Sequence, residues 1–294
     1  MTASKLTIAC FGATGGCVAT TLACALKAGY HCTARTFSIP SISHNITNTF
    51  FNTVARTPDK LLSLLTTEHK ISSSTIDQYL TIHQGDVKDP IIVSKALINP
   101  TNEKLLVDVI VSGVGAYPSF QWSIKTPFPL TDPKICEIAV GAMFTALSNL
   151  SSSKPGIAVN SAGQKPLLIV VSTAGCGRKR GVPLPLNYPY RYLLGSPLAD
   201  KIRMEDVIFE DRGKHIRDFI VMRPLFLIDG DARGDKGLRV GWEWGIEAGE
   251  GGEMEKEPGP EIGYYVSRKD VGIWIFEHAI VQGRWEGKCV YVTY

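Results

Sequence analysis

Short, mostly apolar segments recur along the chain, separated by polar or glycine-containing turns. Their length and character are typical of buried strands. The predicted strands are Leu6–Phe11, Tyr30–Ala34, Thr81–His83, Val107–Ser112, Leu167–Ser172 and Phe219–Met222. Longer segments between them favour helices, because they combine good helix formers with glycine or polar ends. The predicted helices are Val18–Lys27, Pro133–Leu150 and Leu198–Glu210.

Strands that alternate with helices and are apolar on both faces are typical of a parallel sheet covered by helices on both sides. We therefore predict a doubly wound α/β fold. The domain expectation is a core over residues 1–180 and a smaller lobe over residues 181–294. Two strands of that lobe, Phe219–Met222 and Cys289–Thr293, are expected to return to the core.

One segment, at about residues 35–54, interrupts the pattern. It holds a single charged side chain, no acidic residue and ten Ser, Thr or Asn residues. Its flanks nearly repeat, as Ala34-Arg35-Thr36 and Ala55-Arg56-Thr57. Two interpretations stay open, a polar surface loop and a recent insertion such as a retained intron.

A second segment, Gly241–Ile262, is strongly acidic, with seven glutamates, one lysine and six glycines. This composition buries little apolar area, so we expect a mobile acidic loop. Its place late in the chain leaves open a role as a lid over the site.

Composition narrows the class of protein. The chain has 294 residues, 44% of them hydrophobic and 20% charged, and a net charge of +3, which is ordinary for a globular protein. No cluster of basic residues indicates nucleic-acid binding, and no run of 18 apolar residues indicates a membrane span. Seven scattered cysteines without a C-x-x-C pair favour neither a zinc site nor a disulfide framework. With no signal pattern at the N-terminus, we expect a cytoplasmic protein without nucleic-acid or membrane partners.

The strongest chemical signal is a glycine-rich turn between the first predicted strand and helix. It reads Gly12-Ala-Thr14-Gly15-Gly16-Cys17-Val18. In this context Gly12 permits a tight turn, and Gly15 lets backbone N–H groups approach a pyrophosphate at the positive end of the helix. Val18 replaces the third glycine of the dinucleotide-binding pattern. The turn predicts a dinucleotide site that includes Thr14, Gly16 and Cys17.

The end of the second strand favours NADP(H) over NAD(H). An acidic residue there would bind a ribose hydroxyl, whereas an arginine accommodates a 2′-phosphate. The chain offers Arg56 and Lys60 and no acid in position, with Arg35 as the rival if residues 35–54 are a true loop. Asp86 and Val87, after the third strand, are expected beside the adenine. The segment Ser112-Gly113-Val114 is expected beneath the ribose and diphosphate.

At these residues the chain resembles the atypical short-chain dehydrogenase/reductases, and within them the NmrA-like group common in fungi. The resemblance rests on the glycine turn, on Ala55–Leu61, on Val111–Gly115, on Met222-Arg223-Pro224 and on Ser267–Asp270. It implies a Rossmann core with a small C-terminal substrate lobe. It also places Arg223 and Pro224 beside the nicotinamide.

The superfamily's catalytic pattern is a serine after the fifth strand and a Tyr-x-x-x-Lys motif on the next helix. By resemblance, Ser172 and Thr173 supply the hydroxyls and Lys201 the lysine, which also holds the cofactor ribose. The tyrosine position is Pro197, so the usual proton donor is absent. Three tyrosines lie just upstream, and are expected to form an aromatic wall or to provide a relocated acid: Tyr188, Tyr190 and Tyr192.

The sequence thus predicts an NADP(H)-dependent enzyme that acts on a small hydrophobic metabolite, such as a polyketide or alkaloid intermediate. Both hydride transfer and a cofactor-assisted isomerisation or cyclisation fit the residues. The alternative is a regulatory protein that senses NADP(H) without turnover, which the missing tyrosine suits. His83, His215 and His278 are isolated in the sequence, so no metal site is expected.

Overall fold

The structure is a computed structural model that describes residues 6–35, 58–115, 130–246 and 255–294. The chain forms two compact units. The first comprises residues 1–113 and 142–166, and the second comprises residues 114–141 and 167–294. The boundaries of these units differ from the expected division at residue 180. That division into a core and a substrate lobe stays a prediction.

The first unit contains four parallel strands in the order β6-β1-β2-β3. They are β1 (Ile8–Phe11), β2 (Cys32–Arg35), β3 (Leu80–Ile82) and β6 (Val109–Ser112). Strand β1 is buried along its whole length, and it pairs with β2 and β6, one on each side. Because β1 is central, its carboxyl end and the turn that follows lie at the middle of this sheet.

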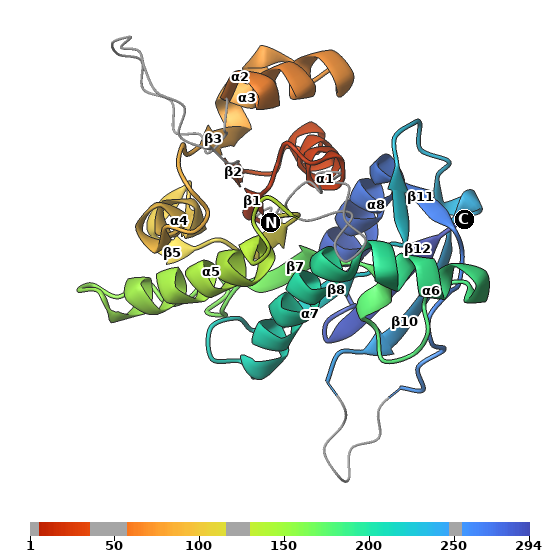
Figure 1. The fold of residues 1–294 in the computed structure, drawn as a ribbon. Coiled ribbons are helices and arrows are strands. Elements are labelled where there is room, and N and C mark those ends of the chain that lie inside the picture. Colours follow the sequence, from red (N-terminus) through yellow and green to blue (C-terminus); the bar gives the residue numbers. More distant parts are fainter. Residues whose placement is uncertain (1–5, 36–57, 116–129, 247–254) are drawn as a thin grey trace. The chain divides into compact units, whose positions relative to one another are not determined.

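Helices connect these strands, as the predicted alternation requires (Figure 1). They are α1 (Gly16–Lys27), α2 (Pro58–Ser63), which continues as a π-helical turn over Leu64–Glu68, α3 (Ser73–Tyr79) and α4 (Pro90–Leu97). Helix α4 leads into a small antiparallel hairpin of β4 (Ile98–Asn99) and β5 (Asn102–Leu106). Asp89 caps α4 by accepting a hydrogen bond from Ile91 N, and Pro90 begins the helix.

The second unit contains the strand order β7-β8-β12-β10, in which only the β12–β10 pair is antiparallel. The strands are β7 (Leu167–Val171), β8 (Asp218–Met222), β10 (Arg239–Trp244) and β12 (Lys288–Thr293). Two further short strands, β9 (Phe226–Ile228) and β11 (Tyr265–Ser267), pair in parallel. The helices are α6 (Leu184–Leu193), α7 (Gly195–Glu210) and α8 (Arg268–Trp274), which continues as a π-helical segment over Ile275–Gln282.

The prediction of an α/β fold with mainly parallel strands is confirmed. Each predicted strand and helix is present, with ends shifted by at most three residues. Residues 36–54, the main part of the suspected insertion, lie outside the described residues.

One local expectation was wrong, and one helix was not predicted. The acidic segment does not begin as a loop, because Gly241–Trp244 belongs to strand β10 and pairs with β12. The Pro-rich segment before α7 forms a helix of its own, α6, even though Pro189 lies inside it. Pro183 and Pro185 lie at its beginning, where a missing N–H costs little, so the helix tolerates them.

Helix α5 (Ile135–Ser152) is apolar along most of its length. It is the one helix of the described residues that could span a membrane by length and composition, although the sequence led us to expect none. Over half of it, 56%, is buried within the protein, as in a core helix, so it is weak evidence for a membrane.

Candidate active site

The glycine turn between β1 and α1 has the conformation that its sequence predicts. Gly12 has a φ of +72°, in the left-handed region that favours glycine. Gly15 N donates to Gly12 O at 2.8 Å, which closes the turn just before α1 begins. A Cβ atom on Gly15 would lie 3.2 Å from that same oxygen, so a side chain fits poorly there.

The start of α1 offers backbone N–H groups to an anion. Gly15 is the N-cap, so no side chain caps the helix, and no acidic residue lies in its first turn. Thr14 and Gly16 are half-buried, and Cys17 is buried. The first N–H groups of a helix have no partner within the helix itself, and together with the helix dipole they favour negative charge at this position. The turn therefore fits the pyrophosphate of a dinucleotide.

The side chain of Val18 explains why position 113 is a glycine. A Cβ atom on Gly113 would lie 2.5 Å from Val18 Cγ2, far inside ordinary contact distance. Gly113 follows β6 directly, and its N–H donates to Phe11 O at 2.9 Å. The valine in place of the third motif glycine is thus accommodated by the absence of a side chain at position 113. Ser112, just before it, is buried.

The other candidates of the first unit differ in exposure. Asp86 is exposed after β3, and its carboxylate accepts a hydrogen bond from Lys88 N at 3.0 Å, whereas Val87 is buried. Lys60 is exposed on α2. Arg56 lies outside the described residues.

In the second unit, Lys201 on α7 is tied to two main-chain carbonyls. Its Nζ donates to Val171 O at 2.7 Å, at the end of β7, and to Val114 O at 3.0 Å. Two of its three N–H donors are therefore used within the protein. The neighbouring Asp200 is fully buried and accepts hydrogen bonds from Cys136 N and Glu137 N, near the start of α5.

Ser172 belongs to a buried ionic network. Its hydroxyl donates to Glu205, one helical turn beyond Lys201, and Glu205 Oε2 accepts from Arg223 Nη2 at 2.6 Å. Arg223 also pairs with Glu243 at 2.5 Å, and Tyr291 Oη donates to the same Glu243 oxygen at 3.0 Å. All of these residues are buried, so the network ties β7, α7, β8, β10 and β12 together.

The electrostatics keep this network ionic at its centre. Burial alone would lower the pKa of Arg223, but the charge of Glu205 and its hydrogen bond with the guanidinium help to raise that pKa above its ordinary value. Burial raises the pKa of Tyr291, so its phenol stays protonated and donates. Arg223 is only 3% exposed, and its guanidinium is committed to two carboxylates within the protein.

Thr173 has a different partner. Its Oγ1 lies 2.5 Å from Tyr190 Oη, on α6. Tyr190 is 4% exposed, whereas Tyr188 is 87% and Tyr192 is 51% exposed. Of the three tyrosines, Tyr190 is therefore the buried one. Burial raises the pKa of Tyr190 to about 12. Its ring also packs edge-on against Phe226, with centroids 5.4 Å apart.

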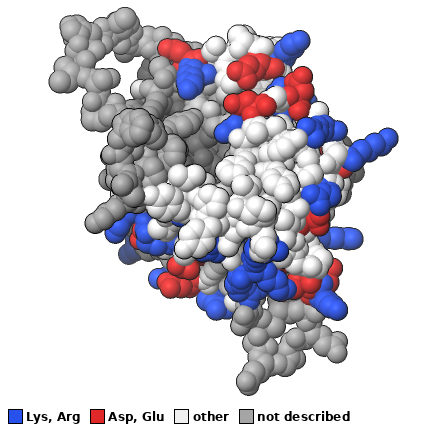
Figure 2. Space-filling view, turned by 45° about the vertical axis from the view of Figure 1, so that its right-hand side comes forward, with Lys and Arg blue, Asp and Glu red and all other residues white. Residues whose placement is uncertain are grey.

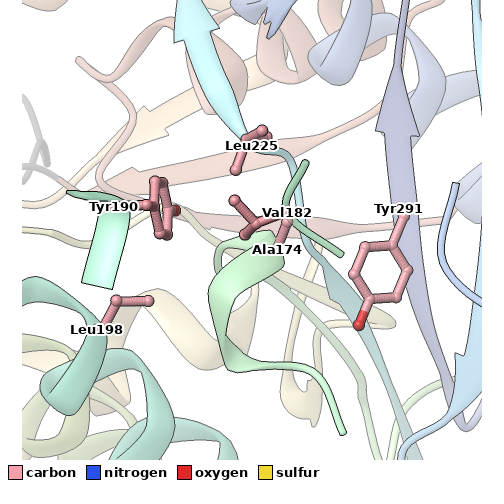
Figure 3. Close-up of a cluster of buried hydrophobic side chains, with 6 residues drawn as sticks. All are labelled: Ala174, Val182, Tyr190, Leu198, Leu225 and Tyr291. Carbon is pink, nitrogen blue, oxygen red and sulfur yellow. The ribbon is translucent and has the colours of Figure 1, made fainter. Parts of the chain in front are cut away.

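The loop that carries these hydroxyls is shaped by glycines. A Cβ atom on Gly175 would lie 2.7 Å from Tyr190 Cε1, and one on Gly181 would lie 2.7 Å from Tyr291 Cε1. Both tyrosines belong to one buried cluster, and Figure 3 shows Ala174 and Val182 between their rings. This packing fixes the loop after β7, and with it the position of Thr173. Pro224 O accepts a hydrogen bond from Ala174 N at 3.0 Å.

The end of the acidic segment is anchored to that same loop. Glu257 pairs with Lys179 and accepts a hydrogen bond from Trp244 N at 2.9 Å. Glu255 pairs with Lys288 at 2.9 Å. Residues 247–254, on which the expectation of a mobile loop and lid mainly rests, lie outside the described residues.

His278 is not isolated in space, although it is in sequence. One ligand atom each from Asp235, Glu277 and His278 lies within 4.8 Å of the others. The two carboxylates are exposed, and an exposed acidic group of this kind needs no metal to be stable.

Sequence reasoning missed Glu243 and Tyr291, and gave Tyr190 no distinct role. A charged residue between Trp242 and Trp244 in an alternating strand was a usable signal for Glu243. Nothing in the local sequence marks Tyr291 or distinguishes Tyr190 from its neighbours, because their partners lie far away along the chain.

Comparison with known proteins identifies relatives along the whole chain. "Reductase pytE" of Aspergillus terreus is 33% identical over 312 residues, which cover 100% of both chains. "Oxidase pynE" of Aspergillus niger is 34% identical over 310 residues, which cover 99% of both. The chain belongs to the family of these two fungal proteins. No protein-family model matches it.

Solved structures support the fold. A Rossmann-fold NAD(P)-binding family protein from Shigella flexneri aligns with a TM-score of 0.52 at 16% identity. The alignment covers 99% of this chain and 94% of that one. The chain therefore has a Rossmann-type α/β fold.

Proposed function

We propose that the chain is an NADP(H)-dependent oxidoreductase of the atypical short-chain dehydrogenase/reductase type, in the NmrA-like group. Its substrate would be a hydrophobic secondary metabolite, such as a polyketide or alkaloid intermediate. The observation that carries this proposal is the turn of Gly12 and Gly15 at the uncapped start of α1. The family relatives named as a reductase and an oxidase support redox chemistry, and the NAD(P)-binding structural neighbour supports a nicotinamide cofactor.

Some of these residues would bind the cofactor, and others would contact the substrate. The helix start would bind the pyrophosphate, and Arg56 with Lys60 would pair with a 2′-phosphate. Asp86 and Val87 would flank the adenine. A bound nicotinamide supplies or accepts the hydride. Lys201 would bind the nicotinamide ribose, and Ser172 and Thr173 are the hydroxyl candidates for the substrate.

An apolar substrate agrees with the surface of the second unit. Figure 2 shows an uncharged stretch of surface bordered by charged side chains. The large apolar side chains that this unit exposes include Leu184, Tyr188, Tyr192, Leu193, Phe226, Ile228, Ile262, Tyr264 and Tyr265. Such a surface favours a hydrophobic metabolite over a charged one. We place the protein in the cytoplasm.

The test separates an enzyme from an NADP(H) sensor. NADPH binding is measured by calorimetry in the wild type and in Gly15→Val, whose side chain would crowd Gly12 O. The same preparations are then mixed with NADPH and each member of a panel of aromatic ketones and quinones. The oxidation of NADPH is followed by its absorbance. We expect binding that Gly15→Val abolishes, together with NADPH oxidation by the wild type. Binding without any turnover would favour the sensor, and absence of binding would exclude both functions.

A further inference from the structure

Strand β10 is the last strand of its sheet, so one of its two edges has no strand beside it. Among the described residues it forms a ladder with β12 alone, in antiparallel register. Its sequence, Arg-Val-Gly-Trp-Glu-Trp, contains no proline and no lysine. The edge of such a strand is a template for pairing with another chain, and proteins usually cover it or blunt it with charge.

The residues 255–262, here called the covering segment, lie along this edge. Gly259 N donates to Trp242 O at 3.1 Å, which forms an isolated antiparallel bridge. Trp244 N donates to a side chain of the segment, Glu257 Oε2, at 2.9 Å. Two backbone groups that a further strand would need are therefore already in use.

The covering segment approaches the strand closely. A Cβ atom on Gly241 would lie 2.5 Å from Gly259 O, so a side chain at position 241 would push the segment away. At the other end of the strand, Arg239 pairs with Glu261 and donates to Ile262 O at 3.1 Å. The sequence of β10 is thus adapted to this neighbour at both positions.

A lysine surrounded by tryptophans anchors the start of the covering segment. The ammonium of Lys288 lies 4.0 Å from the ring centroid of Trp242, 5.3 Å from that of Trp244 and 5.5 Å from that of Trp285. It also donates to Glu255 Oε2 at 2.9 Å, and its side chain is only 10% exposed. A cation that is shielded from water against aromatic rings is held more strongly than an exposed ion pair.

We propose that the covering segment prevents β10 from pairing with a second copy of this chain. Lys288, and the pair of Glu257 with Lys179, hold the segment in place. When it is released, β10 of one copy pairs with β10 of another. Every copy carries the same edge, and a twofold axis relates two identical strands in antiparallel order. This role does not depend on the proposed redox chemistry.

Release of the segment is measured by hydrogen exchange of the Gly259 and Trp244 amides, followed by NMR in ¹⁵N-labelled protein. Lys288→Met keeps the length of the side chain and removes its charge. The protection of the Gly259 amide should then fall by about 10-fold, the order of a desolvated cation–π contact. Lys288→Arg should retain most of the protection. Lys269→Met is the control, because its partner Asp231 has a side chain that is 99% exposed.

Self-association is measured by sedimentation velocity over a range of concentrations. The double variant Lys288→Met/Glu257→Gln should form particles of twice the wild-type mass as its concentration rises. Val240, in β10, is 36% exposed. Adding Val240→Lys to the double variant should restore the wild-type mass, because it places like charges in the pair of strands.

Thermal melts show whether each variant is folded, and Glu257→Gln alone replaces the double variant if the latter is not. Unchanged exchange of the Gly259 amide in Lys288→Met would overturn the anchoring role. A variant whose Gly259 amide exchanges freely while the protein keeps its wild-type mass would overturn the covering role. Association that Val240→Lys does not reverse would also overturn it, since another surface would then be responsible.

Discussion

Glu205 Oε2 and Arg223 Nη2 lie 2.6 Å apart, and each side chain is only 3% exposed. Because Arg223 also pairs with the buried Glu243, removing the guanidinium would leave two carboxylates buried without a cation. Arg223→Met should therefore lower the free energy of unfolding by about 3–5 kcal/mol, as is typical when a buried pair is broken.

The control for this prediction is Arg268→Met in the same unit. Arg268 pairs with Asp229 at 2.8 Å, but the side chain of Asp229 is 93% exposed. Exposed pairs contribute at most about 1 kcal/mol, so this variant should melt near the wild-type temperature. Denaturant unfolding of both variants measures the contrast, and similar losses would contradict the account of the network.

Gly113→Ala should destabilise the protein by about 1–3 kcal/mol, because its Cβ would clash with Val18 Cγ2 and force a backbone shift. Val18→Ala removes that methyl group, so the double variant should recover part of the loss. Gly115→Ala is the control, since its Cβ would meet nothing within 4 Å. Thermal unfolding of the four variants measures the coupling. If the stability losses of Gly113→Ala and Val18→Ala simply added in the double variant, the proposed steric coupling between the two positions would be contradicted.

The strands and the cofactor turn were predictable because the signals are local. Strand β1 is buried throughout and is followed by Gly12, so the neighbouring sequence is enough to place it. The network was not predictable in this way. Arg223 and Glu243 are 20 residues apart and Arg223 and Tyr291 are 68 apart, and only the sheet order brings them together. Helix α6 was missed because its prolines signal a break, whereas most of them lie at its first turn.

Lys201→Met should weaken both the fold and the cofactor site. The variant keeps the length of the side chain but leaves Val114 O and Val171 O without their donor. We expect a loss of about 1–3 kcal/mol in stability and a clear rise in the Kd for NADPH. Lys104→Met, at an exposed position of β5, should change neither quantity. Calorimetry measures the affinity for NADPH, and thermal melting measures the stability. If Lys201→Met bound NADPH as tightly as the wild type, the assigned role would be contradicted.

The contact between Glu257 and Lys179, in the loop after β7, should depend on pH. The hydrogen bond from Lys179 lowers the pKa of Glu257 below its usual value of 4.5. A lowered pKa in the folded state means that the contact stabilises the protein above about pH 4.5 and is lost as the pH falls through the folded-state pKa. Glu257→Gln should therefore melt below the wild type at neutral pH and together with it in strong acid. A gap that persists in acid would contradict this prediction.

Cofactor choice tests the central claim most directly. If Arg56 and Lys60 pair with a 2′-phosphate, calorimetry should show NADPH binding more tightly than NADH by about 1–3 kcal/mol, the usual contribution of charge-assisted hydrogen bonds. Arg56→Ala should remove most of that difference and leave NADH affinity unchanged. Equal affinities for the two cofactors in the wild type would contradict the assignment to NADP(H).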